Sequence, residues 1–286
     1  MQIGQRVALA GMVVSGLLAA IKITAGLMGH STAVVADGLE SAGDVFASGI
    51  VLLGLTLAGK PADWNHPYGH GRIETVTGLF VGFTLAMAGL AISATALRTI
   101  GTATQPPAPF VVWPLIGSAA AKGLLSGVKF HYGKKIRSAA LVADAWNDSV
   151  DILSALAALV AVSFTIVAPH RFASADHWGA FAVGLIVIFT GIRVTRDTTL
   201  QLMDTMPDLE SMAKVRNAAL TVPGVRGVEK CYARKTGLQY HVDLHLEVDP
   251  AITVRQSHEI ATHVRIVIKE TLPWVADVLV HVEPAP

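Results

Sequence analysis

The chain of 286 residues has little cysteine and little charge. Cys231 is its single cysteine, which excludes an internal disulfide or a multi-cysteine zinc site, so any metal site must use His and carboxylate ligands. Only 15% of the residues are charged, whereas about a quarter is usual in soluble domains. A net charge of +1 without a basic domain argues against a nucleic-acid partner. No Walker-type Gly-Lys-Ser/Thr loop occurs, so no nucleotide is expected as the energy source.

Long apolar segments take the place of the missing charge. A transmembrane helix needs about 20 predominantly apolar residues, and the chain has several such segments. They span roughly 7–28, 32–58, 75–98, 110–130, 139–168 and 178–202. If six spans alternate, most lysines and arginines near the span ends, Lys129 among them, fall on one side, and only Arg98 and Arg171 fall on the other. We therefore expect a multi-pass protein of the cell's inner (plasma) membrane with both termini in the cytoplasm.

The character of the sequence changes after residue 206. An amphipathic helix, two strands, a second helix and a last strand are predicted in that order, and the second strand alternates strictly between polar and apolar residues. This is an αββαβ pattern, typical of a small α+β domain of ferredoxin-like or metallochaperone-like type. We predict a transmembrane domain of six helices over 1–206 and a cytoplasmic domain over 207–286.

Two of the apolar spans carry matching rows of polar residues, "VADGLESAGD" at 35–44 and "VADAWNDSVD" at 142–151. Residues four apart share one face of a helix, so Glu40 pairs with Asp44 and Asn147 pairs with Asp151. Each pair begins about 9 residues into its span, roughly 14 Å at 1.5 Å per residue. Both pairs therefore reach the middle of a hydrocarbon layer of about 30 Å.

Ionised carboxylates at that depth cost several kcal/mol unless they are paired or solvated. Because we expect no cationic side chain among them, the simplest explanation is a bound divalent cation that protons replace when it leaves. The alternative is hydrogen bonding between helices through protonated carboxyls, or helix capping if the spans are displaced.

Other polar residues of the spans fit more than one role. Asp37 and Asp144 suit supporting positions or the lining of a water path as well as they suit ligation, and Asp148 lies on a different helical face. Lys22 and Lys122 lie inside apolar spans, where they could snorkel or face a polar interior; we assign them no role.

This combination resembles the cation diffusion facilitator family of divalent-metal/proton antiporters. Six spans, acidic pairs in the second and fifth, a His-bearing loop and a cytoplasmic αββαβ domain match in order over the whole chain. The resemblance implies a homodimer that exports metal from the cytoplasm, driven by proton influx, with metal ions as substrate and regulator and no prosthetic group. It also implies a four-ligand transport site, here called the transport quartet: Glu40, Asp44, Asn147 and Asp151.

The transport quartet departs from the pattern of zinc-handling members, which usually carry a His in it. Oxygen ligands suit harder ions, whereas imidazole favours zinc. The departure favours Mn²⁺ or Fe²⁺, with Zn²⁺, Co²⁺ and Cd²⁺ as alternatives.

A short loop, "DWNHPYGHGRIE", contains Asp63, His66 and His70 at a spacing suited to a metal. The residues alone fit interfacial histidines equally well. The family resemblance implies a second metal site here, with a regulatory or structural role.

The strand "YHVDLHLEV" places His241 and His245 on its polar face, and the last strand places His281 and Glu283 on a common face. A solvated sheet face is the plain interpretation of each residue taken singly. Since family members bind metal between these domains, the resemblance implies a cytoplasmic site. Its candidate ligands are His245, His258, His281 and Glu283, and Glu229 and His241 are further residues near it.

The resemblance also pairs Arg72 with Asp204, as a charge interlock that couples the dimer to the helices at the membrane–cytoplasm junction. Without the family resemblance, Arg72 is an ordinary arginine on the cytoplasmic side of a span, and Asp204 is an unrelated aspartate at a helix end.

Two rival functions remain open from the sequence. A monovalent cation/proton antiporter could use the same carboxylates. An intramembrane di-metal enzyme is the other, but such enzymes use Glu-x-x-His pairs on their helices, and none occurs in the spans. We expect a secondary active transporter rather than an enzyme.

Overall fold

The computed structural model describes residues 3–58, 60–101, 105–135, 139–237 and 239–286. It divides into two compact units. One holds Met1–Ile50 and Phe80–Thr195, and the other holds Val51–Leu79 and Arg196–Pro286.

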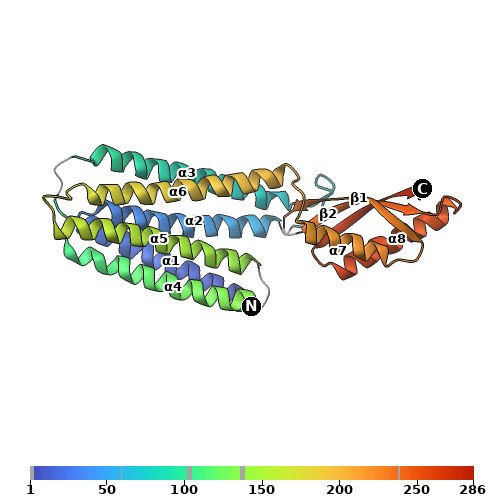
Figure 1. The fold of residues 1–286 in the computed structure, drawn as a ribbon, viewed down its shortest axis with the longest axis horizontal. Coiled ribbons are helices and arrows are strands. Elements are labelled where there is room, and N and C mark those ends of the chain that lie inside the picture. The colour runs from blue at the N-terminus through green and yellow to red at the C-terminus, as the bar shows by residue number, and fades with distance from the viewer. Residues whose placement is uncertain (1–2, 59, 102–104, 136–138, 238) are drawn as a thin grey trace. The chain divides into compact units, whose positions relative to one another are not determined.

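The apolar segments of the first two thirds of the chain form long helices (Figure 1). The long helices are α1 (Ile3–Met28), α2 (Thr32–Ala58), α3 (Arg72–Thr99), α4 (Val112–Lys135), α5 (Ala139–Val167) and α6 (Ala175–Leu202), and a short 3-10 helix, η1 (Pro109–Val111), precedes α4. Among the described residues, five of these helices are long and apolar enough to cross a membrane, namely α1, α3, α4, α5 and α6. The membrane-protein class is confirmed, and α2 as a sixth span stays a prediction.

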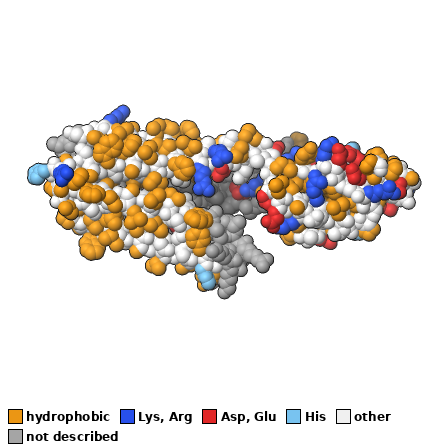
Figure 2. Space-filling model, viewed as in Figure 1, with side chains coloured by type: hydrophobic (Ala, Val, Ile, Leu, Met, Phe, Trp, Pro, Cys, Tyr) orange, Lys and Arg blue, Asp and Glu red, His pale blue; other side chains and the backbone are white. Residues whose placement is uncertain are grey.

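The helices expose large apolar side chains, as a surface in contact with lipid requires. Phe189 on α6 is 67% exposed and Leu124 on α4 is 74% exposed. Figure 2 shows hydrophobic side chains over much of the helical face in view. Lipid tails satisfy such a surface, whereas water does not.

Small residues let α3 and α6 approach closely. A Cβ added to Gly191 would lie 2.4 Å from the Ala86 nitrogen, and one added to Gly89 would lie 2.8 Å from the Gly184 oxygen. Glycines at such contacts are typical of helices packed inside a membrane.

The start of α2 is fixed by a carboxylate from the first turn of α6. Asp176, which is 3% exposed, accepts hydrogen bonds from the Ser31 hydroxyl at 2.6 Å, from the Thr32 nitrogen at 2.6 Å and from the Thr32 hydroxyl at 2.8 Å. An acidic side chain here satisfies the free N–H groups of a helix N-terminus. This cap sets where α2 begins and hence where its acidic residues lie.

The C-terminal residues form α7 (Leu209–Leu220), β1 (Val225–Thr236), β2 (Gln239–Val248), α8 (Val254–Thr271) and β3 (Val275–Pro284). Among the described residues the sheet order is β1-β2-β3, with β1 antiparallel and β3 parallel to β2. The predicted αββαβ order is confirmed. The parallel β2–β3 pair needs a crossover, which α8 supplies.

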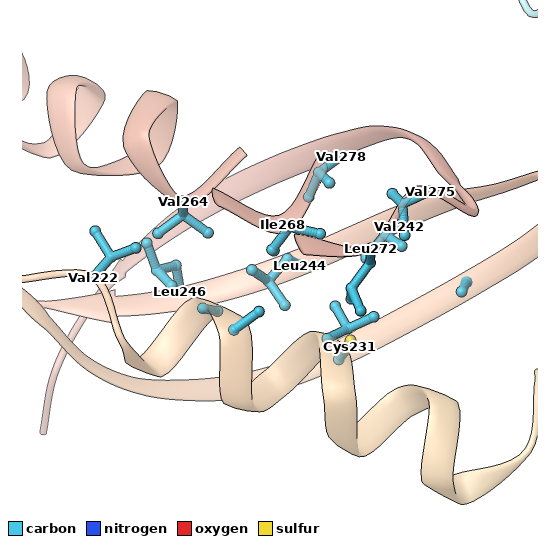
Figure 3. Close-up of a cluster of buried hydrophobic side chains, with 14 of the residues drawn as sticks. Val222, Cys231, Val242, Leu244, Leu246, Val264, Ile268, Leu272, Val275 and Val278 are labelled. Atoms are coloured by element: carbon cyan, nitrogen blue, oxygen red, sulfur yellow. The ribbon is translucent and has the colours of Figure 1, made fainter. Parts of the chain in front are cut away.

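The core of this sheet lies on the apolar face of β2. Val242, Leu244 and Leu246 are almost fully buried, and Val264 and Ile268 of α8 pack in the same cluster (Figure 3). The strict alternation of β2 thus leaves its histidines on the opposite face.

The single cysteine lies in this core, and we expect it to resist alkylation until the domain unfolds. Burial raises the pKa of the Cys231 thiol to about 11, so very little reactive thiolate exists at neutral pH. Mass spectrometry after N-ethylmaleimide treatment should find the native chain almost unlabelled, and one label per chain in concentrated guanidinium. Rapid labelling of the native chain would contradict the buried position.

Candidate metal centre

The acidic rows of α2 and α5 face each other inside the helical unit. Ser154 on α5 donates a hydrogen bond of 2.8 Å to Glu40 Oε1 on α2, and the Asp44 carboxyl lies beside that of Asp151. Glu40 and Asp151 are 8% and 6% exposed. The helical period that placed these residues on one face of each helix therefore brings three carboxylates of the transport quartet together.

The remaining quartet position, Asn147, is half-buried on α5 one turn before Asp151. Its position on the helix places it beside the same group of residues. An amide oxygen there adds a neutral ligand to the three carboxylates.

A lysine from α4 enters this group. Lys122 Nζ donates to Asp151 Oδ2 at 2.5 Å and to Asp148 Oδ1 at 3.1 Å, and it lies 3.8 Å from Asp44 Oδ2. The Lys122 side chain is 2% exposed. Our expectation that no cationic side chain lies among the carboxylates was wrong.

Two further buried lysines pair with acidic residues around the quartet. Lys22 on α1 lies 2.8 Å from Asp37 and donates to the Ser41 hydroxyl at 2.7 Å. Lys129 lies 2.6 Å from Asp148 Oδ2, and at 3% exposure it is not the solvated flanking residue that we counted on the cytoplasmic side. Buried charges persist only when they are paired in this way.

The pairing separates the roles of the acidic residues. Asp37 and Asp148 each have a close ammonium partner. Oxygens of Asp37, Asp148, Glu40 and Asp44 are all buried without a hydrogen-bond partner among the described residues, but the ammonium groups differ: Asp44 Oδ2 is 3.8 Å from Lys122, and Glu40 Oε2 forms no ion pair with a described lysine. Buried carboxylate oxygens of that kind need a cation or a proton. The side chain of Asp144 lies outside the described residues.

The sequence placed Lys22 and Lys122 inside spans, where they could snorkel or face a polar interior, but it gave them no role because hydropathy does not show which helices pack together. A signal was present, since Lys122 and Lys129 lie seven residues apart and so share a face of α4. Asp148 and Asp151 are also near neighbours on α5. Two lysines on one helix and two carboxylates on the next predict ion pairs.

The loop residues form a compact group of their own. Asp63 Oδ1 lies 3.1 Å from His66 Nδ1, and Asp63 Oδ2 lies 3.5 Å from His70 Nε2. One potential ligand atom from each residue falls within 4.8 Å of the others. A hydrogen bond from the His66 backbone N–H lowers the pKa of Asp63, which keeps its carboxylate ionised. The geometry suits a divalent cation.

A second group forms on the polar face of β2 and β3. The parallel register sets His245 opposite His281. His245 Nδ1 lies 2.6 Å from Glu283 Oε1, and His281 Nε2 lies 3.7 Å from that same oxygen. Hydrogen bonds shared first with Glu229 and then with His245 lower the pKa of Glu283.

The other candidate ligands of the cytoplasmic site lie at different places relative to this group. Glu229 Oε2 lies 4.0 Å from His245 Nδ1, at the edge of the group. His241 stacks edge-on against Tyr68, with ring centroids 5.9 Å apart, and desolvation lowers its pKa. His258 is exposed on α8 and lies outside both three-residue groups found among the described residues.

Arg72 and Asp204 lie in contact, with Nη2 and Oδ1 3.0 Å apart. Asp204 adopts a φ of 55°, the left-handed conformation that aspartate tolerates better than most residues. Both side chains are about half exposed, so the pair alone adds little stability. A coupling role for the pair stays a prediction.

Comparison with known proteins covers both parts of the chain. A family model described as the cation efflux transmembrane domain matches residues 8–203, and one described as the cation efflux protein, cytoplasmic domain, matches residues 207–285. The manganese efflux system protein MneP of Bacillus subtilis is 31% identical over 287 residues, which cover 99% of this chain and 97% of MneP.

Other similar proteins extend this comparison. The magnetosome protein MamB of Paramagnetospirillum magneticum is 30% identical over 262 residues, which cover 91% of this chain and 88% of MamB. A solved MamM-CTD variant is 32% identical and covers 28% of this chain and 100% of its own, with a TM-score of 0.27.

Proposed function

Because this chain belongs to the cation diffusion facilitator family, we propose that it exports Mn²⁺ or Fe²⁺ from the cytoplasm in exchange for protons. Metal-cation efflux is the activity of the family; the choice of metal and the proton coupling are our proposal. The transport domain would comprise 1–206 and the cytoplasmic domain 207–286, in a homodimer in the inner (plasma) membrane with both termini in the cytoplasm.

The observation that carries this proposal is a pair of buried oxygens without a hydrogen-bond partner: Glu40 Oε2, and Asp44 Oδ2, which is 3.8 Å from the Lys122 ammonium. They lie with Asp151 at the contact between α2 and α5. A divalent cation would satisfy them in one state and protons would satisfy them in the other. Asn147 cannot take up a proton as a carboxylate does, so proton coupling would rest on the three carboxylates.

The choice of metal rests on the chemistry of the quartet. Its ligands are all oxygen atoms, which suit Mn²⁺ and Fe²⁺ better than a His-containing site does. Two relatives, MneP and MneS of Bacillus subtilis, are named manganese efflux proteins, at 31% and 30% identity. This supports manganese as the first metal to test.

Transport would follow alternating access. Cytoplasmic metal binds the quartet from an inward-facing state, the helices move, and protons from the other side compete for the carboxylates and release the ion. The group of His245, His281 and Glu283 and the loop group of Asp63, His66 and His70 would bind cytoplasmic metal and regulate the dimer. The pair of Arg72 and Asp204 would connect that dimer to the helices.

Metal flux in reconstituted vesicles tests the proposal. We expect uptake of external Mn²⁺ to accelerate when the vesicle interior is made acidic, and to exceed the uptake of Zn²⁺, Co²⁺ and Cd²⁺. Fluorescent metal and pH indicators inside the vesicles measure both ions, with protein-free vesicles as the control.

Each rival function predicts a different result. Metal flux that ignores the pH gradient would rule out proton exchange. Calorimetric binding of Na⁺ without Mn²⁺ or Zn²⁺ would favour a monovalent antiporter, and turnover of a lipid or a quinone would favour an enzyme.

A further inference from the structure

Lys122 is the buried lysine that reaches into the transport quartet. Its ammonium contacts Asp151 at 2.5 Å and lies 3.8 Å from Asp44. We propose that Lys122 is a tethered counter-cation. In the metal-free state its ammonium holds the quartet carboxylates together, and it moves away from them when the metal binds. This inference rests on the proposed metal transport.

The contacts of Lys122 differ from those of the neighbouring lysines. Lys22 and Lys129 lie within 2.8 Å and 2.6 Å of Asp37 and Asp148, neither of which belongs to the quartet. Lys122 instead approaches carboxylates of both α2 and α5 from a third helix, α4. An ammonium in that position offsets the repulsion between Asp44 and Asp151, which would otherwise push the two helices apart.

Asp148 supplies the place to which Lys122 retreats. Its Oδ1 already lies 3.1 Å from Lys122 Nζ, while its Oδ2 is held by Lys129 at 2.6 Å. A lysine side chain has four flexible carbons, so its head can leave Asp151 and keep the contact with Asp148. The ammonium therefore stays buried and paired in both states, without a return to water.

The charges of this group match a divalent substrate. Glu40, Asp44 and Asp151 carry three negative charges when ionised, and Lys122 carries one positive charge. A divalent cation neutralises the remainder, whereas a monovalent cation does not. Lys122 thus lowers the affinity of the quartet for every cation, which assists release. It also makes a doubly charged cation the one that brings the net charge of the site to zero.

Removal of this charge gives a test by binding and flux in the full-length protein. For Lys122→Gln we expect Mn²⁺ to bind about tenfold tighter or more, because one repelling charge is gone. We expect maximal uptake into vesicles to fall by about fivefold or more, because release becomes slower. Calorimetry on purified protein measures the first quantity and vesicle flux measures the second.

Matched variants separate this role from a structural one. Lys122→Arg keeps the charge and should change the Mn²⁺ dissociation constant much less than Lys122→Gln does. Lys22→Gln removes an equally buried lysine outside the quartet and should shift the dissociation constant much less than Lys122→Gln. If Lys122→Gln does not fold without metal, it is purified and assayed with Mn²⁺ present, where the bound ion supplies the missing positive charge, and slower release of Mn²⁺ than from the unmodified protein is expected.

The outcomes distinguish the two proposals. Wild-type protein that transports Mn²⁺, together with unchanged or weaker Mn²⁺ binding in Lys122→Gln, or with unchanged or faster Mn²⁺ release from it, overturns the counter-cation. Wild-type protein that neither binds nor transports any divalent metal overturns the proposed function instead.

Discussion

Replacement of Asp151 by Asn is expected to reduce Mn²⁺ transport by about a hundredfold or more. At an effective dielectric constant near 20, two unit charges about 4 Å apart interact by about 4 kcal/mol, and the metal carries two. The Asp151 carboxylate also contacts the Lys122 ammonium and lies beside the Asp44 carboxyl. Asn keeps the size of the side chain and one oxygen but removes the charge. Vesicle flux together with calorimetric binding measures the loss.

Asp148→Asn is the matched control for this substitution. It is the same chemical change on the same helix, and Asp148 also contacts Lys122, but Asp148 lies outside the quartet. We expect Asp148→Asn to lower thermal stability, since Lys129 loses a charged partner. It should weaken Mn²⁺ binding less than Asp151→Asn does, because Lys122 loses its alternative partner but all four quartet ligands remain. Equal loss of binding in both variants would mean that the ion pairs, rather than the quartet, carry the function.

Asn147→His is expected to shift the ratio of zinc to manganese transport toward zinc by about tenfold or more. Imidazole is a preferred zinc ligand, whereas an amide oxygen favours harder ions. The half-buried position of Asn147, one turn from Asp151, allows a ring nitrogen to join the same group. Competition between the two metals in one vesicle preparation gives the ratio directly.

Asn147→Asp serves as the control for the change of metal. It adds a carboxylate but keeps every ligand an oxygen, so the zinc-to-manganese ratio should remain near that of the unmodified chain. If Asn147→His leaves the ratio unchanged, the argument from ligand hardness fails and the metal is chosen elsewhere in the molecule.

The parts of the fold that depend on periodicity could be predicted from the sequence. The alternation from Tyr240 to Val248 correctly predicted the buried face of β2. The four-residue spacing correctly predicted that Glu40 and Asp44 share a face of α2. Both patterns act within a single element, where backbone geometry alone fixes the direction of each side chain.

Features that depend on the packing of several elements could not be predicted in the same way. Lys22 lies on α1, and only the packed bundle reveals that its carboxylate partner is Asp37 on α2. His258 illustrates the same difficulty in the cytoplasmic part. Helix α8 packs its Val264 and Ile268 on the core face of the sheet, whereas His245 and Glu283 lie on the opposite face. Within one chain, His258 therefore lies on the opposite side of the sheet from His245 and Glu283.

The cap at the start of α2 also constrains how this helix can move. Asp176 accepts four hydrogen bonds from Ser31, Thr32 and Ala33, so α2 cannot slide along its axis past α6 without breaking a buried charged network. Rotation about the capped end leaves that network intact, and it displaces residues in proportion to their distance from the cap. Asp44 would then travel farther than Asp37, and α6, which gives no ligand to the quartet, would act as the fixed pivot for the ligands on α2.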